Sequence, residues 1–442
     1  MRQVLPSIAA LLLAVVLLML SGGLQGSLTG LRAVHEGFPV TVAGLMMSAF
    51  YVGVIAGTRR CGPLINRVGH IRAFAAFCAI NTVCILTFPL VIEPGVWLFL
   101  RAVMGFNMAG LYMAIESWLN ATADARTRGT VMALYMGLSY SAMGGGQLLL
   151  TLGEIGDNRL FMLGAILGTL ALVPVAVTRA SHPAPVESSR FGFRDLYRRS
   201  PLAVLGCALA GTLGGSLFGV GPIYAGALGL DLDGIALFMG VLIFSGLLLQ
   251  LPLGRLSDRL DRRIVIAGTA LGVCAASLVL WPLTDYYSIP TLGANGEESR
   301  FLWLPDPVML LVAAAACGGT IAAIYPLCVA HANDHIDKEH MVQASGGLML
   351  AYGTGAIFGP VGASLGMQLA GPGGLFAFTG MVALLTASLA LWRLRRGAST
   401  EDADKEAFVV MPLATTTPNL GELDPRAPEA GDDGDNDPPP VR

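Results

Sequence analysis

Two ionisable residues lie inside one apolar stretch of this chain. Arg101 and Glu116 are the only charged residues between positions 96 and 118. At about 100° per residue, five residues fall on one helix face: Arg101, Gly105, Met108, Tyr112 and Glu116. If this helix crosses a bilayer, a charge in its middle costs at least about 2.5–3.5 kcal/mol unless it meets water or a partner. The face therefore predicts a cavity or a helix contact. There Arg101 could bind an anion, couple protons, or tether backbone carbonyls.

Glu116 is a carboxylate well inside an apolar stretch. It lies about 22 Å from Arg101 along the helix, so the two cannot pair directly. Two uses stay open for it. One is a gate in which it pairs with a cation from a neighbouring turn: Arg67, Arg126 or Arg128. The other is carriage of a proton, for which it is the leading candidate.

Further polar side chains are scattered through the other apolar stretches. They suit a polar or amphipathic ligand in a mostly apolar cavity, although each could instead join two helices by a hydrogen bond. They are Gln25, Asn107, Tyr112, Tyr140, Gln147, Tyr224, Gln250, Tyr325 and Tyr352. Tyr140, Gly144 and Gln147 share one helix face.

The elements that carry these residues are expected to be membrane spans. The 442 residues are 54% hydrophobic and 13% charged, against about 25% charge in soluble proteins. A span needs about 20 mostly apolar residues. Continuous runs of that length predict about twelve transmembrane helices, and they favour helices over an alternating barrel pattern. The expected spans are 5–30, 40–58, 72–92, 96–118, 130–152, 159–179, 201–226, 234–253, 264–283, 307–330, 342–369 and 373–394.

Arginine placement orients these spans. Nearly all arginines outside the spans fall in alternate connections, and cytoplasmic loops are enriched in Arg and Lys. The spans are therefore expected in the cytoplasmic (inner) membrane, with both termini in the cytoplasm. The predicted parts are a six-helix bundle, a polar cytoplasmic linker, a second six-helix bundle, and an acidic, Pro-rich tail expected to be disordered: 1–180, 181–200, 201–396 and 397–442.

A basic turn occurs twice, once in each half. The first copy carries Gly62, Asn66, Arg67, Gly69, His70 and Arg72. The second carries Gly254, Asp258, Arg259, Asp261, Arg262 and Arg263. The repeat indicates two related halves, a known transporter plan with the binding site between them.

These turns resemble the loop motif of the major facilitator superfamily, Gly-x-x-x-Asp-Arg-x-Gly-Arg-x-Arg. Asn66 replaces its acid in the first copy, and Asp261 replaces its glycine in the second. The segment from Arg101 through Gly105 to Ala109 is similar to the family's helix-4 motif. A closer likeness is to uncharacterised bacterial inner-membrane members, through residues 69–74 and 116–120.

The resemblance implies an all-α fold of twelve transmembrane helices in two pseudo-symmetric bundles, and a role for the turns as a conformational gate. Asp258 and Arg259 would form ion pairs across the halves and close the cytoplasmic side. The first copy, without its acid, would rely on hydrogen bonds. Ordinary positive-inside topology is the plainer interpretation. In the eleventh span, Gly355, Gly359 and Pro360 could form a rocking hinge or simply permit close packing.

The function that this resemblance implies is secondary transport of a small solute by alternating access, coupled to protons, with export slightly favoured. Uptake of a sugar, organic acid or amino-acid-like nutrient is the alternative, and a non-transporting sensor on the same fold is another. The sequence has no phosphate-binding loop of the P-loop type, no clustered catalytic set, and no cysteine pattern typical of zinc or disulfides. We therefore expect no enzyme activity, metal, cofactor or nucleic-acid partner. The expected partners are a small molecule, protons and the lipid bilayer around a monomer.

Overall fold

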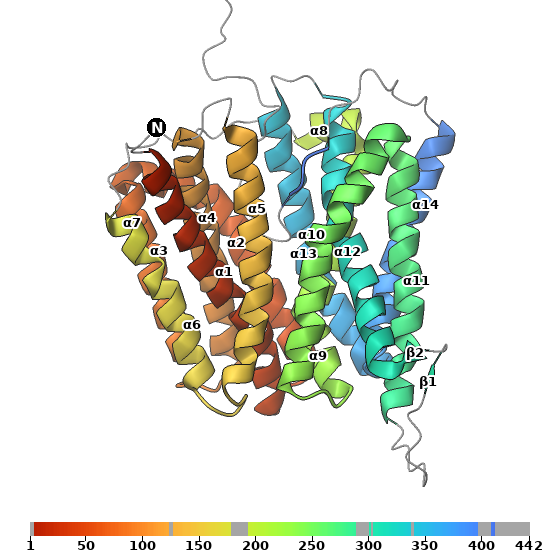
Figure 1. The fold of residues 1–442 in the computed structure, drawn as a ribbon, viewed down its shortest axis with the longest axis horizontal. Coiled ribbons are helices and arrows are strands. Elements are labelled where there is room, and N and C mark those ends of the chain that lie inside the picture. Colours follow the sequence, from red (N-terminus) through yellow and green to blue (C-terminus); the bar gives the residue numbers. More distant parts are fainter. Residues whose placement is uncertain are drawn as a thin grey trace, which may run out of the picture.

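The structure is a computed structural model that describes residues 4–122, 127–177, 193–288, 300–301, 304–336, 340–396 and 408–411. Two groups of long, roughly parallel helices stand side by side in it (Figure 1). The first half of the chain, red to yellow, forms one group, and the second half, green to blue, forms the other. The all-α architecture expected from the sequence is confirmed.

The N-terminal bundle contains the helices α1 to α7. They are α1 (Val4–His35), α2 (Val40–Val68), α3 (His70–Thr87), α4 (Pro94–Thr122), α5 (Arg128–Leu148), the 3-10 turn η1 (Leu149–Leu152), α6 (Arg159–Leu170) and α7 (Leu172–Val177). The last two helices follow one another as a single span, Arg159–Val177. Pro174 lies just after the break, where it cannot donate to the carbonyl of Leu170 four residues earlier.

A short helix and six long ones follow. They are α8 (Phe193–Arg199), α9 (Pro201–Ala227), α10 (Leu232–Arg259), α11 (Arg262–Ser288), α12 (Asp306–Asn333), α13 (Met341–Ala370) and α14 (Gly374–Arg396). Between α11 and α12, the two-residue strands β1 (Arg300–Phe301) and β2 (Leu304–Pro305) pair antiparallel, with Arg300 opposite Pro305. Helix α8 falls in the predicted linker, where no helix was expected. Its Leu196 is fully buried near Gly347 of α13.

Among the described residues, eleven helical segments are long and apolar enough to cross a membrane. Helix α5 is not one of them, although it has 21 residues and stands within the N-terminal bundle. Its sequence is rich in Gly, Ser and Tyr and ends in Gln147-Leu148. Helix α5, which corresponds to the predicted span 130–152, is therefore more polar than the other spans.

Glycines bring equivalent helix pairs together in both bundles. A Cβ atom added at Gly146 of α5 would lie 2.4 Å from the carbonyl oxygen of Leu20 in α1. In the second bundle, a Cβ at Gly211 of α9 would lie 1.9 Å from the carbonyl oxygen of Tyr352 in α13. Small residues permit such close approach in membranes. The two halves thus repeat one packing plan.

The molecule has two ends, which we name by α8. The α8 face carries α8, the start of α1 and both basic turns, and it is the face expected to be cytoplasmic (Figure 1). Toward the opposite end, α2 and α13 join the bundles. Ser48 Oγ donates to the carbonyl of Ile357 at 2.6 Å, and Gly44 lies against Pro360 and Ser364.

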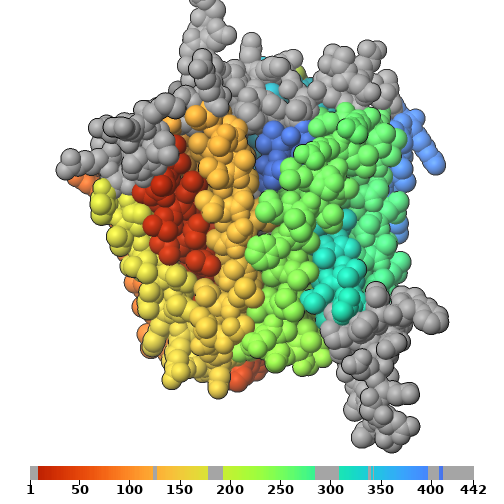
Figure 2. All heavy atoms as spheres, viewed as in Figure 1, coloured from red at the N-terminus to blue at the C-terminus, as the bar shows by residue number. Residues whose placement is uncertain are grey.

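Four residues of the C-terminal tail are placed on the α8 face. Residues 408–411 lie between the bundles, where Figure 2 shows blue atoms between the orange of α5 and the green of the second half. The tail was expected to be disordered. Four of its residues are placed in the structure, and Met411 among them is buried. The rest of the tail, and residues 181–192 of the predicted linker, lie outside the described residues.

Candidate functional site

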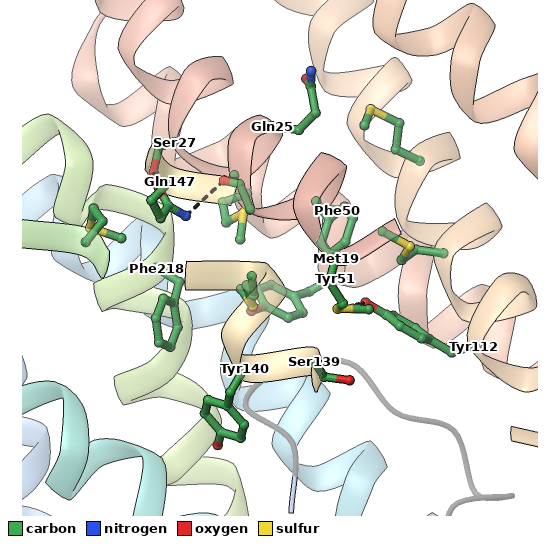
Figure 3. A pocket seen from close by; sticks show the side chains of 18 of the residues that line it. Met19, Gln25, Ser27, Phe50, Tyr51, Tyr112, Ser139, Tyr140, Gln147 and Phe218 are labelled. Carbon is green, nitrogen blue, oxygen red and sulfur yellow. Dashed lines mark hydrogen bonds between the residues drawn. The ribbon is translucent and has the colours of Figure 1, made fainter. Parts of the chain in front are cut away.

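A cavity of about 100 Å³ lies at the junction of the two bundles (Figure 3). Most of its lining comes from α1, α2, α4 and α5, and Phe218 of α9 and Met239 of α10 complete it. Its walls are largely apolar. The lining residues are Met19, Gly22, Gly23, Gln25, Gly26, Ser27, Met47, Phe50, Tyr51, Arg101, Met104, Met108, Tyr112, Tyr135, Ser139, Tyr140, Met143, Gln147, Phe218 and Met239.

Arg101 is the charged residue of this lining. Its side chain is buried, with 4% of the residue exposed. Nη2 lies 2.8 Å from the sulfur of Met47, and the guanidinium carbon lies 4.8 Å from the centroid of the Phe50 ring. Among the described residues, no carboxylate forms an ion pair with Arg101. A sulfur atom and a ring face offset little of the charge of a buried cation.

A polar wall faces the cavity from α1 and α5. Gln147 Nε2 donates to the carbonyl of Gly23 at 2.9 Å, and Ser27 Oγ donates to Gln147 Oε1. These bonds fix the orientation of the amide. Ser139 Oγ and both amide atoms of Gln25 are buried and have no hydrogen-bond partner within the described part of the chain. Such groups are costly unless a ligand or water satisfies them.

Glu116 lies behind the cavity wall rather than in it. It is fully buried, and the hydroxyl of Tyr135 donates to its Oε1 at 3.1 Å. Tyr135 itself lines the cavity. One tyrosine therefore connects the cavity with the buried carboxylate.

The cavity brings together half of the predicted pathway residues. Gln25, Arg101, Tyr112, Tyr140 and Gln147 line it. The other predicted residues, besides Glu116, are placed elsewhere. Tyr224 donates to the carbonyl of Leu280, Tyr325 packs edge-on against Tyr352 at 5.0 Å, and Asn107 is buried outside the lining.

Sequence reasoning missed the phenylalanines and most of the methionines of the lining. Met108 stands on the predicted face of Arg101, and Met104, three positions after Arg101, could have been found by the same helical spacing. Gly105, which the same spacing put on that face, lies instead against the backbone of Phe50 in α2. Met19, Met47 and Met143 had no such signal, because which face of α1, α2 and α5 turns inward depends on tertiary packing.

The two basic turns are built differently. In the first, Gly69 ends α2 with φ +90° and its N–H donates to the carbonyl of Ile65. A side chain is strained at that angle, so glycine is required. In the second, Leu260 has φ −114°, and Asp261 then caps α11 by accepting the N–H of Arg263 at 2.9 Å. An aspartate can replace the motif's glycine because this turn uses a helix cap.

Asp261 also binds the guanidinium of Arg263 through both carboxylate oxygens. Burial by itself would raise the pKa of Asp261, but the hydrogen bonds and charge of Arg263, helped by His331, hold that pKa below its ordinary value. The carboxylate therefore stays ionised as the cap of α11.

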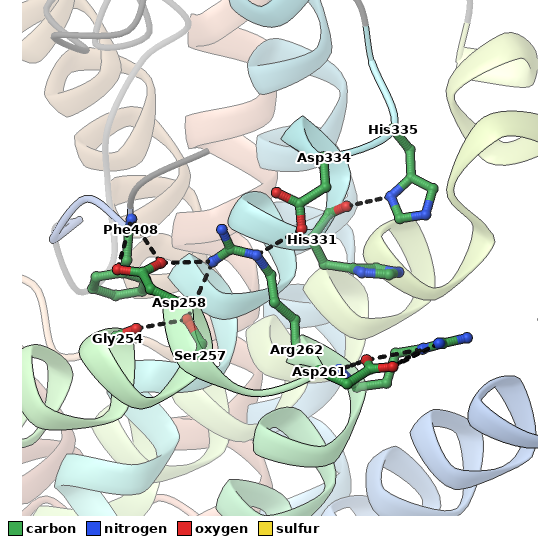
Figure 4. Close-up of polar contacts among 10 residues, drawn as sticks. Gly254, Ser257, Asp258, Asp261, Arg262, His331, Asp334, His335 and Phe408 are labelled. Carbon is green, nitrogen blue, oxygen red and sulfur yellow. Dashed lines mark hydrogen bonds and ion pairs between the residues drawn. The ribbon is translucent and has the colours of Figure 1, made fainter. Parts of the chain in front are cut away.

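Arg262 joins the ends of three elements on the α8 face (Figure 4). Its Nε donates to Asp334 Oδ2 at 2.7 Å, and its Nη1 lies 3.4 Å from Asp258 Oδ1. Asp258 also accepts the N–H of Phe408 in the tail at 3.1 Å. Arg259, Asn66, Arg67 and Arg72 are exposed, and Gly62 and Gly254 are buried. The predicted ion pairs across the halves stay a prediction for a state closed on this face.

The predicted hinge residues of α13 lie at helix contacts. Added Cβ atoms at Gly355 and Gly359 would meet the backbone of α9 at 1.7 Å and 2.2 Å. Pro360 lies within the continuous helix α13 and contacts Gly44 of α2. These contacts account for small residues at these positions by packing, and the hinge stays a prediction.

The chain matches the model of the Major Facilitator Superfamily over residues 11–294 and 300–423. It belongs to this family. Among its relatives is an uncharacterized MFS-type transporter of Yersinia pestis (strain Pestoides F), 27% identical over 363 residues, which are 81% of this chain and 88% of the relative. Another is the uncharacterized MFS-type transporter YcaD of Salmonella newport (strain SL254), 28% identical over 361 residues, with the same coverage. The expected likeness to uncharacterised bacterial members is confirmed.

Solved structures share the major facilitator fold at low identity. The nucleoside transporter NupG has a TM-score of 0.70 and 13% identity over 88% of this chain and 98% of its own. A bacterial homolog of the human lysosomal transporter Spinster, in an inward-facing and occupied conformation, has a TM-score of 0.67 and 14% identity over 90% of this chain and 97% of its own. At this identity the two structures show the fold alone. Membership of the family supports a multi-pass secondary transporter and leaves its substrate open.

Proposed function

We propose that this transporter carries a small, partly apolar organic anion through the cavity of Arg101 by alternating access. The observation that carries the proposal is the buried guanidinium without an acidic partner in the described residues. A carboxylate that enters the cavity would supply that partner in a low dielectric, where the attraction is strong.

The rest of the lining suggests the body of the solute. Methionine, phenylalanine and tyrosine side chains surround Arg101, and methionine adapts to different apolar shapes. An apolar cavity of about 150 Å³ holds benzene. This cavity, at about 100 Å³, is smaller, so in this conformation it suits a short-chain carboxylate. The free hydroxyl of Ser139 could bind a hydroxyl or carbonyl on it.

This proposal predicts selective stabilisation by anions. Propionate and similar short-chain carboxylates should raise the melting temperature of the purified protein, whereas the matching amides, such as propionamide, should not. Differential scanning fluorimetry measures this, and counterflow of radiolabelled propionate in proteoliposomes tests movement. Equal effects of propionate and propionamide would contradict an anion site.

We further propose that transport is coupled to protons through Glu116. The carboxylate is buried, and Tyr135, which lines the cavity, donates a hydrogen bond to it. Glu116→Gln should therefore keep counterflow exchange but lose the stimulation of net transport by a pH gradient, because the amide cannot carry a proton. The matched control is Glu93→Gln. Glu93 is exposed and directly precedes α4, whereas Glu116 lies near the other end of that helix. Retained stimulation in Glu116→Gln would exclude Glu116 as the proton carrier.

Export from the cytoplasm is the proposed direction, because a charge-poor, methionine-rich cavity suits amphipathic compounds more than hydrophilic nutrients. The α8 face is then cytoplasmic, in the inner membrane. Inside-out vesicles with an acidic lumen should accumulate the solute, because protons that leave the lumen exchange for it, and right-side-out vesicles should not. The opposite pattern would indicate uptake.

A further inference from the structure

Residues 408–411 of this chain's own tail lie on the α8 face and bond to both α5 and α10. We propose that the space between these two helices is a binding site for an apolar, extended peptide segment, and that residues 408–411 occupy it as a wedge that blocks the cavity and keeps the α8 face from closing. The wedge has to leave before the transport cycle can proceed.

Backbone groups of the segment are bound at both of its ends. The N–H of Phe408 donates to the Asp258 carboxylate at 3.1 Å, and the N–H of Met411 donates to Gln250 Oε1 at 3.2 Å. The carbonyl of Met411 accepts the hydroxyl of Tyr140 at 3.2 Å. Main-chain bonds of this kind give a groove affinity for an extended peptide.

Side chains of the segment touch both bundles. The ring of Phe408 covers Gly254, where an added Cβ would lie 2.1 Å from a ring carbon. Val409 and Val410 pack against an apolar cluster made wholly of N-terminal bundle residues, and Met411 is buried with 6% exposed. A segment that bonds to α5 and α10 and packs on both halves resists their relative movement.

The wedge lies next to the solute cavity and on the gate. Tyr140 both lines the cavity and binds Met411, and Gln250 Nε2 donates to the hydroxyl of that tyrosine. Asp258 is the acid of the second basic turn, and here it binds the tail. Closing the α8 face would bring α5 and α10 together where the segment now lies, so the closed state and the bound wedge exclude each other.

The chain length permits this placement. Helix α14 ends at Arg396, and eleven residues separate it from Phe408. At about 3.3–3.6 Å per residue, this connection can reach up to about 40 Å. The segment can therefore come from the same molecule.

The first test asks whether the segment occupies the opening. In full-length Gly254→Cys/Phe408→Cys protein, mild oxidation should form a bridge between the two new thiols, found by mass spectrometry as linked peptides. Gly268→Cys/Phe408→Cys is the matched control, because Gly268 has open space around it, and it should form no bridge. A missing bridge in the first variant would overturn the proposal.

The second test asks whether the wedge blocks the cavity. A thiol at Ser139→Cys in the cavity lining should react with a membrane-impermeant maleimide added from the α8 face. Val409→Asp/Val410→Asp should raise that rate at least tenfold, since the charged side chains disfavour the apolar site, whereas Val409→Ile/Val410→Ile should leave it unchanged. The rate at which the maleimide reacts with protein that keeps Ser139 is subtracted, because it measures the reaction of the native cysteines. Equal rates in both tail variants, in monodisperse protein, would overturn the blocking role.

Discussion

Arg101→Met is expected to abolish transport of the anion and, at the same time, to make the protein more stable. The substitution removes the cation that the solute needs. It also removes a charge whose burial costs about 2.5–3.5 kcal/mol near the middle of a membrane, and Arg101 has no acidic partner among described residues to offset that cost. Counterflow in proteoliposomes should fall at least a hundredfold, while the melting temperature in detergent rises by several degrees.

Arg101→Lys is the control for charge against shape. It keeps the cation but loses the planar group that lies over Phe50 and beside Met47, so transport should be weakened rather than lost. A lower melting temperature in Arg101→Met would contradict the claim that the buried charge of Arg101 destabilises the protein. It would instead indicate that Arg101 mainly holds α4 against α2.

Gly355→Ala is expected to destabilise the protein by about 3 kcal/mol or more. The added methyl would lie 1.7 Å from the carbonyl oxygen of Ala208. That atom belongs to the backbone of α9, so the two helices would have to separate along their contact. Thermal unfolding followed by circular dichroism should show a clear fall in melting temperature and a loss of monodisperse protein.

Gly137→Ala provides the comparison. Gly137 lies in α5 with nothing within 4 Å of its Cβ position, so alanine should be neutral or slightly stabilising because it favours the helix by up to about 1 kcal/mol. Equal melting temperatures for the two variants would refute the close contact of α13 with α9.

The helices were predictable because lipid imposes a simple requirement on sequence. A run of about 20 apolar residues marks a span whatever its neighbours are, and the arginine-rich turns mark where spans end. The two turns also showed that the halves repeat. The boundaries moved outward, as in α2, which continues to Val68 instead of ending near position 58, since a helix can extend beyond the hydrocarbon.

The cavity was only half predictable. Polar side chains such as Gln147 stand out in an apolar run, but a methionine such as Met47 looks the same whether it faces lipid, a helix or a solute. Tyr224 is the opposite case. It was predicted for the pathway as a polar side chain, but its hydroxyl donates to a backbone carbonyl inside the second bundle. The tail segment was hidden by composition. Residues 408–411 are a short apolar run within an acidic, Pro-rich stretch, and their partners are far away in sequence.

The polarity of α5 bears on how the protein enters the membrane. A span leaves the insertion machinery for lipid when its own transfer free energy is favourable, and α5 is not apolar enough by the measure that the eleven other segments meet. Its Gly146 packs against α1, which is synthesised earlier. We therefore expect the insertion of α5 to depend on contact with α1, and the biogenesis of the first half to depend on the order of synthesis as well as on the finished fold.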